Sequence, residues 1–202
     1  MEIYLLRHGC SMANASNLVT GSKEDILCPE GREQARAASR LLHCFALDAD
    51  DTTCFVSDWK RARETAALAA PTQSFCVDSR LGETDAGAAA EMDLDTFNRA
   101  YPAFWLSFTA DRAYPGGESH ADLYARVLNW RDEVENTLTP GAKVLAVTHA
   151  GPLCCLLHAA CKVDMAHFPM FLAANASLSK LERVGAGSWR LAFFSFSYEM
   201  LV

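Results

Sequence analysis

The chain has little that would draw it to nucleic acid or to a membrane. Its 202 residues carry 18 Lys and Arg against 25 Asp and Glu, a formal net charge of −7, so it lacks a positive field that would attract a polyanion or an anionic bilayer. The apolar stretch Ile3–Leu6 is stopped by Arg7 and His8, and no later stretch reaches the roughly 18 apolar residues of a membrane span. We therefore expect a cytoplasmic protein without a nucleic-acid or membrane partner.

The cysteine pattern lacks the spacings of several kinds of site. Eight cysteines are present, but no Cys-x-x-Cys pair occurs, which removes support for a zinc knuckle or a thioredoxin-like redox pair. No cysteine is followed six residues later by arginine, so the phosphate loop of a thiolate phosphatase is missing. We expect reduced thiols, no metal and no cofactor.

What the chain does contain is an alternation of strands and helices, without repeats or linkers. Apolar runs at residues 2–6, 53–56 and 143–148 are typical of buried strands, and residues 31–45 and 119–138 carry apolar stripes at helical spacing. Segments 178–181 and 189–196 indicate a late hairpin. This order predicts one α/β domain over residues 1–202, with a mainly parallel sheet flanked by helices.

Polar side chains follow three of the predicted strands. They supply hydroxyl, amide, imidazole and guanidinium groups, from Arg7, His8, Ser11, Asn14, Ser57, Arg61 and His149. Ligands of open α/β sheets bind beyond the carboxyl ends of the strands, so we expect these groups to meet. Two imidazoles and two guanidinium groups suit a doubly charged phosphate.

Each of these residues also has a structural interpretation. A single His after a strand is usually structural, and Arg61 lies in a basic cluster typical of a solvated helix face. Ser57 and Asp58 are both candidates to cap a helix that begins near Trp59. The remaining histidines lack partner spacing and are expected to be structural: His43, His120, His158 and His167. The joint placement at strand ends favours the phosphate site.

Short blocks of sequence around these residues carry a family resemblance. Residues 6–14 (LRHGCSMAN) contain Arg-His-Gly, then a Ser, then an Asn, and later blocks are 57–66 (SDWKRARETA), 81–83 (LGE), 115–119 (PGGES), 148–152 (THAGP) and 175–177 (NAS). In this order the blocks resemble the histidine phosphatase superfamily, in its phosphoglycerate mutase-like branch. The resemblance spans nearly the whole chain. It implies a three-layer α/β sandwich with a cap-like helical segment around residues 85–118.

The resemblance also implies a role for each matching residue. His8 would be the nucleophile that forms a phosphohistidine, Arg7, Arg61 and His149 would bind the phosphoryl oxygens, and Glu83 would protonate the leaving oxygen. Secondary phosphate contacts would come from Ser11, Asn14, Thr20, Gly21 and Ala150. The implied activity is metal-independent hydrolysis of a small-molecule phosphomonoester. The oligomeric state is open, a homodimer included.

The sequence departs from the family's pattern in two places. After Glu83 the family often continues Asp-Phe-Gly-x-Trp-Glu-Gly, whereas residues 85–91 read DAGAAAE, which either widens the leaving-group site or changes how this loop packs. Cys10 stands where many relatives carry Glu, and is either a redox-sensitive thiol or a small buried filler. The nearby aromatic residues are expected to bind an apolar leaving group or to form a helix core: Tyr101, Phe104, Trp105 and Phe108.

Three other functions are compatible with the sequence. A phosphoglycerate mutase needs extra basic residues for a second phosphate, but the segment between Glu83 and the 115–119 block offers only Arg99 and Arg112, which favours hydrolysis. Residues 48–52 fit the Asp-x-Asp-x-Thr motif of haloacid dehalogenase-like phosphatases, although they follow a helical stripe rather than a strand. The third alternative is a protein of the same fold that binds a phosphorylated ligand without turnover.

Overall fold

A six-stranded sheet with the order β3-β2-β4-β1-β5-β6 runs through the computed structural model, which describes residues 1–104, 109–185 and 187–201. The strands are β1 (Glu2–Arg7), β2 (Thr52–Val56), β3 (Phe75–Val77), β4 (Lys143–Thr148), β5 (Leu178–Gly185) and β6 (Ser188–Phe196). Strands β1 to β4 pair in parallel, whereas β5 pairs antiparallel with both β1 and β6. The predicted mainly parallel sheet and the late hairpin are both confirmed.

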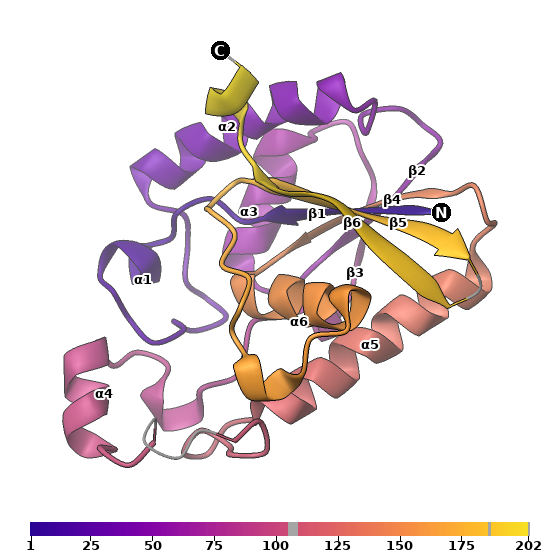
Figure 1. Cartoon of the computed structure of the whole chain (residues 1–202). Helices are drawn as coiled ribbons and strands as arrows, with labels where there is room; N and C mark the ends of the chain where they lie inside the picture. The colour runs from indigo at the N-terminus through magenta and orange to yellow at the C-terminus, as the bar shows by residue number, and fades with distance from the viewer. Residues whose placement is uncertain (105–108, 186, 202) are drawn as a thin grey trace.

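Helices cover both faces of this sheet and complete a three-layer sandwich (Figure 1). Helices α2 (Pro29–Cys44) and α3 (Lys60–Ala69) lie on one face, and α5 (His120–Thr137) and α6 (Ala150–Cys161) lie on the other. Within the ranges given above, no helix is long and apolar enough to cross a bilayer.

The central residues of β1, Ile3–Leu6, are buried because they contribute to two hydrophobic cores. Ile3 and Leu5 pack with α5 and α6, whereas Tyr4 and Leu6 pack with α2 and α3. Successive side chains of a strand point to opposite faces of the sheet. An unbroken apolar run therefore places the sheet between two helical layers and leaves its strand ends for polar groups.

The two long predicted helices are present, but one predicted cap is wrong. Ser119 and Asp122 form a reciprocal capping box at the start of α5, with each side chain accepting the other's backbone N–H. Helix α3 instead has Trp59 at its N-cap, with no side-chain cap. The predicted caps Ser57 and Asp58 lie one or two residues too early, and the Ser57 hydroxyl contacts the candidate site described below.

Short helices gather beyond the carboxyl ends of the parallel strands (Figure 1). They include α1 (Met12–Ala15) and α4 (Leu94–Ala100). Around α4 a small apolar cluster forms from Ala86, Ala89, Phe97, Phe104 and Tyr114, with Tyr101 packed against it. Two methyl groups of the loop at 85–91, those of Ala86 and Ala89, are buried in this cluster. Trp105 and Phe108 lie outside the described residues, and a capping role for segment 85–118 stays a prediction.

Candidate active site

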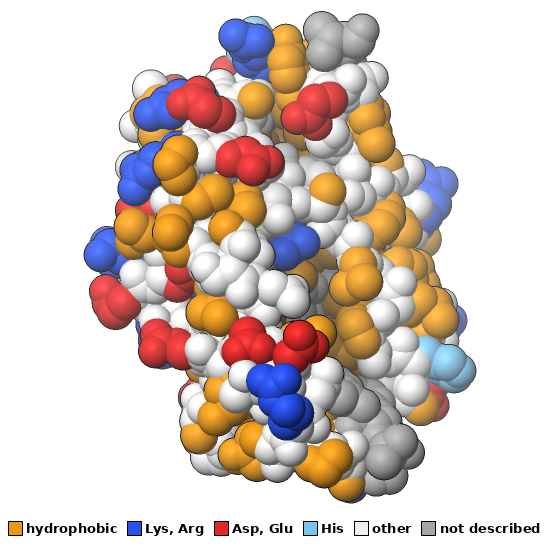
Figure 2. All heavy atoms as spheres, turned by 90° about the vertical axis from the view of Figure 1, so that its left-hand side faces the viewer, with side chains coloured by type: hydrophobic (Ala, Val, Ile, Leu, Met, Phe, Trp, Pro, Cys, Tyr) orange, Lys and Arg blue, Asp and Glu red, His pale blue; other side chains and the backbone are white. Residues whose placement is uncertain are grey.

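The register of the sheet brings two histidines side by side. Arg7 at the end of β1 pairs with Thr148 at the end of β4, so His8 and His149 leave the sheet together. Their ring centroids are 4.9 Å apart. Figure 2 looks onto this end of the molecule, where basic atoms lie in a hollow at the middle of the face. The predicted meeting of strand ends is therefore present in the structure.

His8 is buried and held in one orientation. Its Nδ1 lies 2.7 Å from the Gly9 carbonyl oxygen, and its Nε2 lies 3.1 Å from Nε of Arg61. Since a carbonyl only accepts, Nδ1 carries the ring proton and Nε2 presents its lone pair. Burial, then the charges of Arg61 and Arg7, hold the pKa of His8 well below its ordinary value. A neutral imidazole with an unprotonated Nε2, here accepting the Arg61 Nε–H, is a competent nucleophile.

His149 is fixed by the hydroxyl of Ser57. The Nε2 of His149 lies 2.8 Å from Ser57 Oγ, which also accepts the backbone N–H of Trp59 at 3.1 Å. The hydroxyl can donate its proton to Nε2, and we assign the His149 ring proton to Nδ1 on this basis. Burial, then the charges of Arg61, His8 and Arg7, lower the pKa of His149. The buried Nδ1 of His149 has no hydrogen-bond partner among the residues the structure describes.

Arg61 is buried and anchored by the loop that precedes α2. Its Nη1 donates to Asp25 Oδ2 at 3.2 Å and its Nη2 donates to the Thr20 carbonyl at 3.0 Å, while its guanidinium carbon lies 4.6 Å from the centre of the Trp59 ring. These contacts hold the Arg61 guanidinium group in an orientation in which Nε faces His8. Burial lowers the pKa of Arg61, but an arginine at this site keeps its charge.

Arg7 approaches the same site from β1. Its Nη1 donates to the Ala173 carbonyl at 2.5 Å, and its buried Nε has no partner in the described part of the chain. Buried polar groups are normally hydrogen-bonded. Two buried N–H groups, on Arg7 and on His149, are thus available to an anion with several oxygens, and Arg61 supplies further positive charge.

Glu83 lies close to this cationic cluster. Its half-buried carboxyl group accepts the backbone N–H of Thr84 at 2.9 Å and that of Gly151 at 3.2 and 3.3 Å. Its charge interacts with those of Arg7 and Arg61. Gly151 is in the first turn of α6, where a Cβ atom would lie 2.2 Å from Glu83 Oε1. A glycine at 151 is what lets the carboxyl group approach the helix.

The predicted secondary contacts adjoin the site but bond mainly within the protein. Ser11 and Asn14 form the capping box of α1, and the Thr20 hydroxyl donates to the Gly21 carbonyl at 3.2 Å. Gly21 has a φ of +72°, and a Cβ there would lie 3.4 Å from Nη1 of Arg61. Ala150 begins α6, directly after His149. Phosphate contacts by these five residues stay predictions.

Comparisons with known proteins identify the family of the chain. The model of the histidine phosphatase superfamily (branch 1) matches residues 3–195. The chain belongs to this family. It is 33% identical over 161 residues to a 2,3-bisphosphoglycerate-dependent phosphoglycerate mutase from Methylobacterium sp. (strain 4-46), which covers 75% of this chain and 76% of that relative. It is 28% identical over 189 residues to the probable phosphoglycerate mutase GpmB of Serratia proteamaculans (strain 568), covering 90% and 85%.

Solved structures superpose on nearly the whole fold. A mycobacterial glucosyl-3-phosphoglycerate phosphatase in complex with VO3 matches with a TM-score of 0.86 and 28% identity, covering 97% of this chain and 99% of that one. A putative alpha-ribazole-5'-P phosphatase from Escherichia coli matches with a TM-score of 0.79 and 22% identity, over 96% and 95% of the two chains. The second match shows the fold alone.

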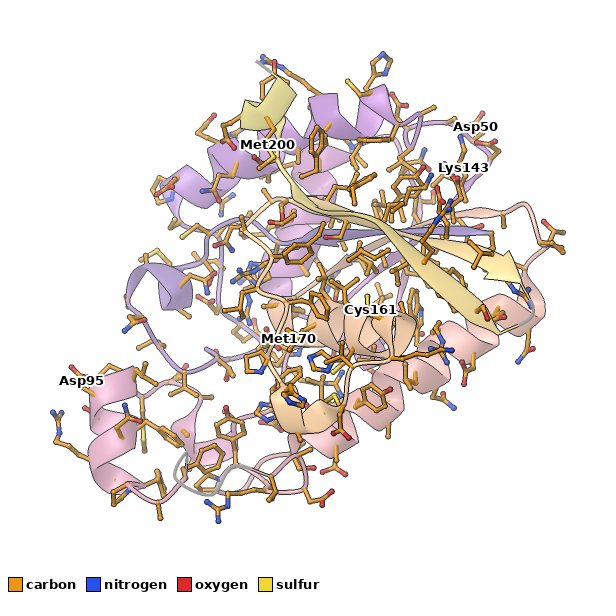
Figure 3. All side chains as sticks on the ribbon, viewed as in Figure 1. Asp50, Asp95, Lys143, Cys161, Met170 and Met200 are labelled. Atoms are coloured by element: carbon orange, nitrogen blue, oxygen red, sulfur yellow. The ribbon has the colours of Figure 1, made fainter. Side chains whose placement is uncertain are left out.

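The rival metal-dependent motif lies away from the histidine phosphatase site. Residues 48–51 precede β2, at the amino end of the parallel strands, and Asp48 Oδ2 lies 2.7 Å from Nδ1 of His43. Figure 3 places Asp50 and Lys143 at one end of the molecule and Asp95 of α4 at the other. Over residues 1–104, 109–185 and 187–201, no group of three or more His, Cys, Asp or Glu is placed to hold a metal ion.

Several residues of the site were missed by the sequence analysis. Asp25 is the buried partner of Arg61, although nothing local distinguishes it from other acids of its loop. Asn175 donates through Nδ2 to the His8 carbonyl at 3.1 Å, and its Asn-Ala-Ser block was the available signal. His120 is buried next to Phe168, and the expectation that it is structural stays a prediction.

Proposed function

We propose that this protein is a phosphatase that hydrolyses a small-molecule phosphomonoester through a phosphohistidine on His8. The observation that carries the proposal is the arrangement of His8, with Nδ1–H on a carbonyl and the Nε2 lone pair in contact with Arg61. The buried N–H groups of Arg7 and His149 supply further partners for phosphoryl oxygens. A mycobacterial glucosyl-3-phosphoglycerate phosphatase is similar to this protein over 97% of the chain.

In the first step the Nε2 lone pair of His8 attacks phosphorus. An N–P bond forms, the bond between phosphorus and the ester oxygen breaks, and the leaving oxygen takes a proton from the Glu83 carboxyl group. Arg7, Arg61 and His149 neutralise the charge on the phosphoryl oxygens in the transition state. Preorganised charged donors of this kind contribute on the order of 10²-fold each in rate.

In the second step water completes the hydrolysis. Glu83 is now a carboxylate and accepts a proton from the water that attacks phosphorus. The N–P bond breaks and its electron pair returns to Nε2 of His8, which regenerates the neutral imidazole. The lowered pKa of His8 favours this neutral form at both ends of the cycle.

The contacts of Arg99 and Arg112 favour hydrolysis over mutase-type transfer. Arg99 donates to the Thr96 hydroxyl at 3.0 Å, and Arg112 donates to the Phe104 carbonyl at 3.0 Å. Both arginines thus bond within segment 85–118 rather than toward His8. Phosphoglycerate mutase remains the second candidate, because curated relatives carry that name at 28–33% identity.

A phosphate-ester panel tests the proposal. The wild type should release inorganic phosphate and form an acid-labile, base-stable phosphoenzyme, and His8→Ala should lower the rate at least roughly 10³-fold. His43→Ala, at an exposed histidine, is the matched control. Formation of 2-phosphoglycerate from 3-phosphoglycerate and a bisphosphoglycerate would favour the mutase. No turnover and no phosphoenzyme would favour a binding protein.

The proposed substrate is a small phosphate ester rather than a nucleic acid, because the chain has a net charge of −7 and the cationic groups of the site are buried. A cytoplasmic location, a homodimer and independence of metals and other cofactors are further predictions from the sequence. Activity retained in excess EDTA is the expected result for the last of these.

A further inference from the structure

Arg126 of α5 uses every N–H group of its guanidinium. Nε and Nη2 donate to the two carboxyl oxygens of Glu118 at 3.0 and 2.6 Å. Nη1 donates to the carbonyls of Arg80 at 2.7 Å and Gly82 at 3.0 Å, and Nη2 also donates to the carbonyl of Glu83 at 2.9 Å. One side chain thus holds three main-chain carbonyls around the residue proposed as proton donor.

Glu118 secures the other side of the same segment. Its backbone N–H donates to the Asp85 carbonyl at 2.8 Å, and its Oε1 accepts the Asp85 N–H at 2.9 Å. The Arg126 and Glu118 side chains are only 24% and 18% exposed. The pair therefore clamps segment 80–85 at both ends through a two-pronged, largely buried ion pair.

The Arg126–Glu118 pair acts on the Glu83 backbone, whereas the Glu83 carboxyl group rests on the Gly151 N–H. Fixing both the main chain and the carboxyl group leaves little freedom for the carboxyl to move relative to the site. General acid catalysis depends on such placement, because a misplacement near 1 Å weakens proton transfer.

We propose that Arg126, with Glu118, is a positioning residue for Glu83 and sets the enzyme's ability to cleave esters with poor leaving groups. This inference rests on the proposed phosphatase function. An alkyl or sugar alkoxide is a strong base and needs a proton as it departs. Nitrophenolate is a weak base and departs without one. A misplaced Glu83 therefore slows the first kind of ester selectively.

The test compares p-nitrophenyl phosphate with glycerol 2-phosphate. For Arg126→Lys and for Glu118→Gln we expect the rate of phosphoenzyme formation from glycerol 2-phosphate, measured in a single turnover, to fall about 10- to 100-fold. The same rate from the nitrophenyl ester should fall less than about 3-fold, and the affinity for either ester should change little. Arg131→Lys is the matched control, because Arg131 lies on the same helix and pairs with Asp132. Glu83→Gln should reproduce the selective loss, and adding Arg126→Lys to it should cause no further loss.

An equal fall on both substrates would show that the ion pair is only structural and would overturn the inference, as would a further loss in the double variant. If Arg126→Lys does not fold, as judged by circular dichroism, Glu118→Gln carries the same comparison. A fully active His8→Ala would instead overturn the proposed function, and this inference with it. An inactive His8→Ala together with unselective Arg126 and Glu118 variants overturns the inference alone.

Discussion

The Nε–H of Arg61 donates to Nε2 of His8 at 3.1 Å, and both side chains are buried. A permanent cation therefore contacts the atom that the proposed mechanism uses as nucleophile. It opposes protonation of the imidazole, and it is placed to receive a phosphoryl oxygen once phosphorus approaches Nε2. Asp25 holds this guanidinium in place from the opposite side.

Removing this cation should raise the pKa of His8 toward its ordinary value, since Arg61 is the largest charge effect lowering it. For Arg61→Gln we expect phosphoenzyme formation to slow by roughly 10²-fold. The loss of rate that accompanies protonation of His8 at low pH should begin at a higher pH than in the wild type. Rapid-quench measurements across pH 4.5–8 give both quantities. Arg63→Gln, at an exposed position of the same helix, should leave the profile unchanged. If the low-pH fall in rate occurs at the same pH in Arg61→Gln as in the wild type, Arg61 does not lower the pKa of His8.

Buried neutral histidines also make the fold sensitive to acid. The pKa values of His8 and His149 are held well below 6.5 in the folded chain, whereas the unfolded chain binds protons near pH 6.5. As pH falls below that value, the two histidines bind protons in the unfolded state but stay neutral in the folded state. The free energy of unfolding should then drop by about 1.4 kcal/mol per pH unit for each histidine, down to the lowered folded pKa.

Urea unfolding at pH 5, 6, 7 and 8 measures this slope. His8→Gln should lower the slope of unfolding free energy against pH, between pH 5 and 6.5, by the contribution of about one titrating histidine. His43→Gln should not flatten the slope, because Asp48 raises the pKa of His43 and its linkage has the opposite sign. A slope in His8→Gln equal to that of the wild type would show that His8 is not held neutral.

Local patterns were enough to predict the frame of the fold and the main site. The apolar run of β1 and the Ser119–Asp122 capping box each report on their own neighbourhood. The parallel sheet then brings the strand ends together, so His8 and His149 meet as predicted although 141 residues separate them.

Contacts made by long side chains could not be predicted in the same way. Arg126 looks like any arginine on a helix, yet it bonds to carbonyls 43 to 46 residues away. Asp25 and Arg61 are 36 residues apart and their contact depends on how one loop folds back. Arg32 of α2 likewise pairs with Glu64 of α3, which is 32 residues away in sequence. Such partners cannot be predicted from composition or periodicity, because tertiary packing determines which distant residues meet.

Cys10 should behave as an inert thiol rather than as a redox switch. Burial, followed by contact with the Cys28 thiol, raises the pKa of Cys10 to about 11, and the reactive thiolate is scarce at neutral pH. We expect iodoacetamide at pH 7.5 to label exposed Cys44 and Cys76 first, with activity retained. Mass spectrometry of labelled peptides checks the order. Rapid loss of activity that phosphate prevents would instead identify a reactive Cys10.

Gly151→Ala should displace the proposed proton donor without touching the nucleophile. The added Cβ would lie 2.2 Å from Glu83 Oε1 and 3.1 Å from Leu123, so the carboxyl group must leave the Gly151 N–H. With general acid catalysis worth about 10²-fold or more, kcat on glycerol 2-phosphate should fall by about that factor. The phosphoenzyme should still form from p-nitrophenyl phosphate, because that leaving group needs no proton.

Gly141→Ala is the control, since a Cβ there meets nothing within 4 Å in the described structure. Unimpaired hydrolysis of glycerol 2-phosphate by Gly151→Ala would remove Glu83 from the proposed mechanism.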